Sequence, residues 1–211
     1  MESKHAQRAE KTKRAILKAA AQLFAKRSFE DFTMRDIAKL AGCSHTAIYI
    51  YFKDKEELLN RLAAEPLGEV IRKFELILSE RTAPPHERLL RLSREFVRFA
   101  LDNRTMYSVF FTVKPTRVDD EQPALEIQSL RNRVFDLVGA ALGAALETEV
   151  DQERLLACTR AYFFLLHGIV ASYVTSPEGV DSLFDRLETT FDLAFGSMLA
   201  GLKCEIKSSG G

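Results

Sequence analysis

The chain has 211 residues, of which 46% are hydrophobic and 28% charged; this is enough to bury a sizeable core and argues against a disordered chain. Its 30 basic and 30 acidic side chains cancel, which argues against a uniformly basic nucleic-acid coat protein or a polybasic membrane binder. The two signs are unevenly placed, because residues 1–60 hold 12 basic and 8 acidic side chains and residues 61–211 hold 18 and 22. A basic surplus at one end of a chain indicates nucleic-acid contact there.

The N-terminal part predicts a series of helices, because its apolar side chains recur with the 3.6-residue period. The first helix is expected over residues 8–26. Thr33, with Asp36 three residues later, predicts a capping box at the start of a second, short helix. Gly42 then ends that helix, since glycine readily takes the left-handed conformation that closes a helix C-terminus.

Two further helix starts follow closely. Ser44 can cap a third short helix over residues 45–51, and Asp54 with Glu57 predicts a capping box for a fourth. Beyond Pro66 most of the helical stretches are longer, and a polar loop interrupts them over residues 116–123. The expected stretches are 67–80, 86–102, a short aromatic segment over 106–111, and about 124–146, 151–175 and 180–202.

The pattern therefore predicts an all-α fold with a small N-terminal domain and a larger helical body. The boundaries are expected at residues 1–64, 65–204 and a flexible tail over 205–211. The most apolar run, residues 161–174, has 14 residues and is shorter than the roughly 20 needed to span a membrane, so a buried helix is expected. The charged N-terminus lacks the apolar core of a signal peptide, and a soluble cytoplasmic protein without membrane contact is expected.

The two short helices joined by a glycine-containing turn fit a helix-turn-helix, whose second helix lies in the major groove of DNA. Ile48 and Phe52 lie four residues apart and should face the core of this small domain. Tyr49 and Tyr51 can present hydroxyl groups to phosphates, and Lys55 can add a charge-assisted phosphate contact. The residues expected to meet base edges are Ser44, His45, Thr46 and Ala47.

Within residues 12–58, the segments 33–38, 41–44 and 48–58 are similar, in register, to the DNA-binding domain of the TetR family. The resemblance implies a three-helix N-terminal DNA-binding domain, a C-terminal effector-binding and dimerisation domain, and a homodimer that binds palindromic double-stranded DNA. Arg35 is included among the candidate DNA-binding residues. The family's DNA-facing positions map onto Thr33, Ser44, His45, Thr46, Ala47, Tyr49, Tyr51 and Lys55.

Three positions depart from the family pattern. Ser28 stands where a glycine commonly ends the first helix, and Cys43 replaces a usual valine. Thr46 replaces a frequent glycine, which should alter base contacts without abolishing binding. A redox role for Cys43 is conceivable, but no neighbouring residue in the sequence suggests a low thiol pKa, so core filling is favoured.

Aromatic and methionine side chains gather between residues 96 and 164 of the body. Most such residues form ordinary core, but together they allow an apolar pocket with a few polar groups, the usual form of a small-molecule site. His167 taken alone is more often a core histidine. The candidate effector-binding residues are Phe96, Phe99, Asn103, Tyr107, Phe110, Arg131, Phe135, Phe163 and His167.

Residues 162–170 are similar to the "WHG" variant of the TetR C-terminal domain, with Leu166 in place of the tryptophan. The family resemblance implies that the last two helices pair with their counterparts in a four-helix dimer interface. From the sequence alone, these helices could instead pack within the monomer. The apolar stripe in question comprises Leu183, Leu187, Phe191, Phe195 and Met198.

No motif points to catalysis, a metal or a cofactor. Cys43, Cys158 and Cys204 form no CxxC pair, the histidines lack metal-ligand spacing, and no nucleophile, base and orienting group share a recognisable spacing. We therefore expect a regulator that is not an enzyme: a repressor that a small, largely apolar effector releases from its operator. The alternatives are an activator of the same fold, or a binding module acting through protein partners.

Overall fold

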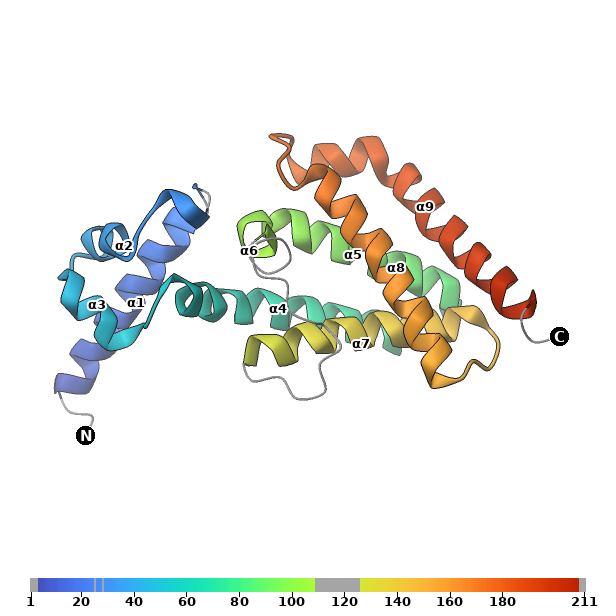
Figure 1. Cartoon of the computed structure of the whole chain (residues 1–211), viewed down its shortest axis with the longest axis horizontal. Coiled ribbons are helices and arrows are strands. Elements are labelled where there is room, and N and C mark those ends of the chain that lie inside the picture. Colours follow the sequence, from blue (N-terminus) through green and yellow to red (C-terminus); the bar gives the residue numbers. More distant parts are fainter. Residues whose placement is uncertain (1–3, 25, 28, 109–125, 209–211) are drawn as a thin grey trace. The chain divides into compact units, whose positions relative to one another are not determined.

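A computed structural model describes residues 4–24, 26–27, 29–108 and 126–208, and in these ranges the regular elements are helices, as predicted (Figure 1). The chain forms two compact units, one of residues 1–66 with 105–115 and one of residues 67–104 with 116–211. The first boundary thus falls two residues beyond the expected one and lies inside a helix. The predicted loop over 116–123 and the candidate Phe110 lie outside the described residues.

The first unit packs short helices around an apolar core. Helix α1 contacts α2, and α2 contacts α3. Ile16 of α1, Ile37 of α2 and Ile48 of α3 are fully buried, which is why the apolar period predicted these elements. The elements are α1 (Lys4–Phe24), the 3₁₀ turn η1 (Phe29–Asp31), α2 (Met34–Ala41), α3 (His45–Tyr51) and the first part of α4 (Lys55–Ser79).

Helix α4 corrects the expected break at Pro66, because one helix runs from Lys55 to Ser79 with Pro66 inside it. Proline cannot donate a helical hydrogen bond, so the carbonyl of Leu62, four residues earlier, receives none from it. The fixed φ of proline is nevertheless compatible with a helix, and apolar residues on both sides are buried. Burial on both sides explains why the helix continues.

The second unit is built around α5 (Pro85–Asp102), which packs against three other helices. Those helices are α7 (Glu126–Leu146), α8 (Gln152–Tyr173) and α9 (Val180–Ser208). Leu92 and Phe96 of α5 are buried, and the buried Ser93 hydroxyl lies 2.8 Å from that of Tyr162 on α8. Ser93 Oγ also donates to the carbonyl of Leu89, so this polar pair is satisfied inside the core.

The small residues of α7 permit a close approach of α8. A Cβ atom added to Gly139 would lie 3.2 Å from Oγ1 of Thr159 on α8, which is tighter than ordinary packing. The short helix α6 (Arg104–Ser108) begins two residues earlier than the expected segment. Arg104 donates to the carbonyl of Glu178 at 2.7 Å and to that of Ser176, so it braces the turn between α8 and α9.

Helix α9 packs its predicted stripe mainly within the monomer. Leu183, Phe191 and Phe195 are buried in the single chain, whereas Leu187 and Met198 are half-buried. Most of the stripe therefore packs within the monomer, which was the alternative that the sequence left open. Helix α9 also continues through Ser208, so residues 205–208 are helical and not part of a flexible tail.

Candidate nucleic-acid interface and effector cluster

The turn between α2 and α3 is fixed by the predicted caps. Thr33 Oγ1 accepts from the backbone N–H of Asp36 at 3.3 Å, and the Asp36 carboxylate accepts from Thr33 N–H at 2.8 Å and from the Thr33 hydroxyl. These bonds lower the pKa of the Asp36 carboxyl. Gly42 has φ +71° and closes α2, and Ser44 Oγ accepts from the N–H of Ala47 at 3.1 Å to open α3.

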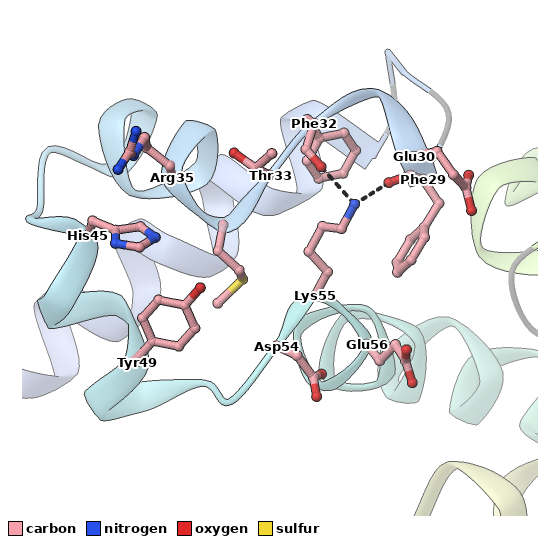
Figure 2. A pocket seen from close by; sticks show the side chains of 11 residues that line it. Phe29, Glu30, Phe32, Thr33, Arg35, His45, Tyr49, Asp54, Lys55 and Glu56 are labelled. Atoms are coloured by element: carbon pink, nitrogen blue, oxygen red, sulfur yellow. Dashed lines mark hydrogen bonds between the residues drawn. The ribbon is translucent and has the colours of Figure 1, made fainter.

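Helix α3 divides its side chains between core and solvent. Ile48 is fully buried, and Phe52, which caps the helix, is 3% exposed, as predicted. His45 and Tyr49 lie one helical turn apart and are exposed, with their rings 5.2 Å apart and nearly perpendicular (Figure 2). Thr46 is exposed, whereas Ala47 and Tyr51 are half-buried.

A surface hollow of about 570 Å³ brings five of the predicted DNA-binding residues together. These are Thr33, Arg35, His45, Tyr49 and Lys55, from α2, α3, the start of α4 and the residue before α2 (Figure 2). Ser44, Thr46, Ala47 and Tyr51 do not line it. Other residues of its wall were not predicted from the sequence, because their contribution depends on how η1 folds against α4. These residues are Phe29, Glu30, Phe32, Met34, Asp54 and Glu56.

Lys55 has a structural partner that the sequence analysis did not predict. Its ammonium donates to the carbonyl of Phe32 at 2.7 Å and to that of Phe29 (Figure 2). The same nitrogen lies 4.4 Å from the Phe29 ring centroid and 4.9 Å from that of Phe32. The first residue of α4 is thereby joined to η1 and to the residue that precedes the Thr33 cap.

The start of α4 is also capped by its own residues. Asp54 Oδ1 accepts from the N–H of Glu57 at 2.8 Å, as predicted, while the Glu57 carboxylate accepts from the N–H of Lys53 at 2.7 Å. The return bond thus reaches one residue beyond the predicted partner. Cys43, next to the turn, is half-buried, and desolvation raises the pKa of its thiol, which makes the reactive thiolate scarce.

In the second unit, the rings of four predicted effector-binding residues are in contact, and a fifth candidate, Arg131, lies close enough to His167 to affect its charge. The His167 ring of α8 lies 4.4 Å from Phe163 and 5.7 Å from Phe96 of α5, and Phe163 lies 5.2 Å from Phe135 of α7. Arg131 precedes Phe135 by one helical turn and is only 4% exposed. We refer to Phe96, Arg131, Phe135, Phe163 and His167 as the aromatic cluster.

Burial changes the ionisation of the two basic members of this cluster. Desolvation lowers the pKa of His167 to about 4, with a further contribution from the Arg131 charge, so the imidazole is neutral at pH 7. Desolvation lowers the pKa of Arg131 to about 10, which leaves the guanidinium charged at pH 7. A buried cation thus lies within electrostatic range of His167, in a low-dielectric environment.

Three further predicted effector-binding residues, Phe99, Asn103 and Tyr107, are among the described residues. Phe99 is half-buried on α5, and the Asn103 amide donates to the Phe99 carbonyl at 2.9 Å, which closes the end of that helix. Tyr107 groups with the first unit, and burial raises the pKa of its hydroxyl. Among the described residues, no group of three or more histidine, cysteine or acidic side chains is arranged to hold a metal ion.

A capped helix-turn-helix on a larger helical body is the architecture of a DNA-binding transcriptional regulator. Residues 16–62 match the family described as bacterial regulatory proteins of the tetR family, and residues 89–194 match its tetracyclin repressor-like C-terminal domain. The chain therefore belongs to the TetR family of ligand-responsive transcriptional regulators. The finer resemblance of residues 162–170 to the WHG variant stays a prediction.

Known regulators share this similarity along much of the chain. The HTH-type transcriptional regulator TtgR of Pseudomonas putida is 28% identical over 191 residues, 84% of this chain and 87% of that protein. The fatty acid metabolism regulator protein of Bacillus subtilis is 28% identical over 112 residues, 53% of this chain and 58% of that protein. The crystal structure of FadR from Bacillus subtilis in complex with stearoyl-CoA shares the fold, with a TM-score of 0.57 at 20% identity, covering 89% of this chain and 96% of that one.

We predict that Lys55→Met destabilises the first unit by about 1–3 kcal/mol, because two carbonyls lose a charged donor while the apolar stem is kept. Urea unfolding monitored by circular dichroism measures the loss. Lys53→Met is the matched control: Lys53 is exposed in the same loop, and its substitution should change stability by less than about 0.5 kcal/mol. Equal stability of the two variants would contradict the structural role of Lys55.

We predict that His167 makes stability fall with acidification. Its pKa of about 4 in the folded state lies below the unfolded value of about 6.5, so the unfolded chain binds the proton first. The contribution of His167 to the free energy of unfolding is complete above pH 6.5 and falls by about 2–3 kcal/mol as the pH drops to 4. Urea unfolding across this range should show a shallower fall for His167→Gln and an unchanged one for the exposed control His86→Gln.

Proposed function

We propose that this protein is a transcriptional repressor that binds a palindromic operator as a homodimer and leaves it when a small, largely apolar effector enters the body. The observation that carries the proposal is helix α3, which is capped by Ser44, anchored by buried Ile48, and exposes His45, Thr46 and Tyr49. Exposed polar residues at the start of such a helix suit base edges in a major groove. A DNA target also implies that the protein works in the cytoplasm.

The proposed DNA contacts fall into two groups. His45, Thr46 and Ala47 meet base edges, while Arg35, Tyr49 and Tyr51 contact phosphates. Thr33 and Ser44 form helix caps and add at most a second bond each to the backbone of DNA. Lys55 has three ammonium hydrogens and gives two to carbonyls, so one remains for a phosphate.

A homodimer through α8 and α9 is supported by apolar surface that the single chain leaves uncovered. Helix α8 is long and apolar enough to cross a membrane by length and composition, yet only 33% of its most apolar 18-residue window is buried. Phe164 of α8 and Leu193 of α9 are each 70% exposed. Small exposed residues flank them and permit close helix contact: Ala157, Gly168 and Ala171 on α8, with Ala200 and Gly201 on α9.

The effector site is proposed at the aromatic cluster, with Phe99, Asn103, Tyr107 and Phe110 as further candidates from the sequence. The rings of Phe96, Phe135 and Phe163 supply apolar contacts. The Arg131 guanidinium favours an effector that carries one acidic group, because an anion gains most from a cation in a low-dielectric site. An apolar chain with an anionic group also suits the stearoyl-CoA seen with FadR.

The mechanism is a shift between two populations. The effector binds better to an arrangement of the dimer in which the two recognition helices no longer match the spacing of the half-sites. Repression is favoured over activation because a related protein, KstR2 of Mycolicibacterium smegmatis, is an HTH-type transcriptional repressor. Exposed His45 and Tyr49 argue against a module that acts only through protein partners.

We predict that the purified protein enriches an inverted repeat from a pool of random DNA duplexes, because a two-fold dimer presents two identical recognition helices. High-throughput sequencing of the bound fraction identifies the repeat. Enrichment of no inverted repeat would overturn the proposal. Leu193→Glu should yield monomers by light scattering and lose the repeat, whereas Leu76→Glu, at a site 66% exposed on α4, should keep both dimer and repeat.

We predict that hydrophobic acids raise the melting temperature and release the operator more effectively than their neutral counterparts. Dodecanoate and its methyl ester are a suitable pair, compared by differential scanning fluorimetry and by fluorescence anisotropy of labelled operator. At a ligand concentration about 100 times Kd, stabilisation should approach about 2.7 kcal/mol. Arg131→Met should erase the difference between acid and ester; a wild-type response that is equal for both would contradict the acidic-group proposal.

A further inference from the structure

Ile50 is an exposed apolar residue on the recognition helix that the candidate DNA-binding set does not include. It is 76% exposed, compared with 51% for Leu40 and 47% for Tyr49 in the same unit. Single exposed apolar residues are common on protein surfaces, so exposure alone assigns no role. The position of Ile50 on α3 is what distinguishes it.

The geometry of α3 points Ile50 away from the protein. Successive residues of an α-helix turn by about 100°, so Ile50 lies about 200° from Ile48. Ile48 is fully buried against the core of the first unit, and Ile50 therefore extends from the opposite side of the helix. It follows the exposed Thr46 by four residues and lies on the same face.

Packing and helix propensity give no reason for an isoleucine here. A β-branched side chain loses rotamer freedom in a helix, and at an exposed position an alanine, lysine or glutamate would favour the helix more. The apolar side chain gains free energy only when another molecule covers it. For the outward face of a recognition helix, that molecule is DNA.

The major groove offers an isoleucine one apolar group, the 5-methyl of thymine. The other groups on the base edges there are hydrogen-bond donors and acceptors, which an alkyl side chain cannot satisfy. We propose that Ile50 determines operator sequence by packing on a thymine methyl in each half-site. This inference rests on the operator binding proposed above and adds a specificity residue to it.

The test replaces thymine by uracil, which differs only by the missing methyl group. In the selected operator, each thymine is replaced in turn at symmetric positions of both half-sites, and Kd is measured by fluorescence anisotropy at fixed salt. For the wild type, uracil substitution at one symmetric pair of thymines should weaken binding about fourfold for each methyl group removed, or about sixteenfold for both. This magnitude follows from the typical free energy of burying one apolar carbon. Substitution at thymines that Ile50 does not contact should have a smaller effect.

Ile50→Ala should bind the thymine operator more weakly and lose most of the thymine–uracil difference at that pair. Leu40→Ala is the matched control, since it removes an exposed apolar side chain from α2 and should keep the full difference. The melting temperature measured by circular dichroism should not fall for Ile50→Ala, because the side chain is exposed and alanine favours the helix. This measurement separates lost contact from lost fold.

Two results overturn the inference while leaving the proposed function intact. One is a wild-type affinity that no uracil substitution changes, and the other is an undiminished thymine–uracil difference in Ile50→Ala. Failure to select any operator would instead overturn the proposed function, and this inference with it. The experiment therefore distinguishes an error about Ile50 from an error about the protein.

Discussion

The Lys55 ammonium is the point on which the geometry of the DNA-reading end depends. It donates to two carbonyls, that of Phe29, which begins η1, and that of Phe32, which directly follows it. Phe32 directly precedes Thr33, whose side chain opens α2. The start of α4 is therefore linked through η1 to α2, and through the Gly42 turn to the recognition helix. In the proposed repressor, this link gives a shift at the start of α4 a direct route to the DNA-contacting side chains.

The helices of the second unit have apolar residues on more than one face. Helix α5 is buried against α7, α8 and α9, while α8 and α9 retain exposed apolar residues at Phe164 and Leu193. The homodimer proposed above would cover these exposed residues. The same unit holds a buried cation, Arg131, and removing a charged group from water costs stability. The acidic effector proposed above would offset part of this cost.

What could be predicted from the sequence was what depends on near neighbours. The caps at Thr33 and Ser44 were predictable because a side chain and the backbone N–H three residues later decide them. The Gly42 cap was predictable because glycine readily takes the left-handed conformation that ends a helix. The partners of Lys55 lie 23 and 26 residues away, so no local pattern could reveal them. The helix through Pro66 was missed because burial on both sides outweighs the local preference of proline.

The same limit explains the outcome at the two candidate sites. The sequence shows that Phe163 and His167 lie four residues apart, but which residues of α5 and α7 meet them depends on tertiary packing. For α9, periodicity identified an apolar stripe but not whether the chain itself or a second copy covers it. The structure buries most of that stripe within the single chain, and Leu193, which lies outside the stripe, is exposed and would face the second copy in the proposed homodimer.

On the proposed DNA-binding surface, some residues stabilise the fold and others are exposed and free to vary. Ser44 and Lys55 hold the fold with the same groups that could bind phosphate, so they are costly to change. Thr46 and Ile50 are exposed on one face of α3 and take little part in packing, so they can change with little effect on stability. If Thr46 and Ile50 contact bases as proposed, operator sequence would be read by residues that contribute little to the stability of the fold.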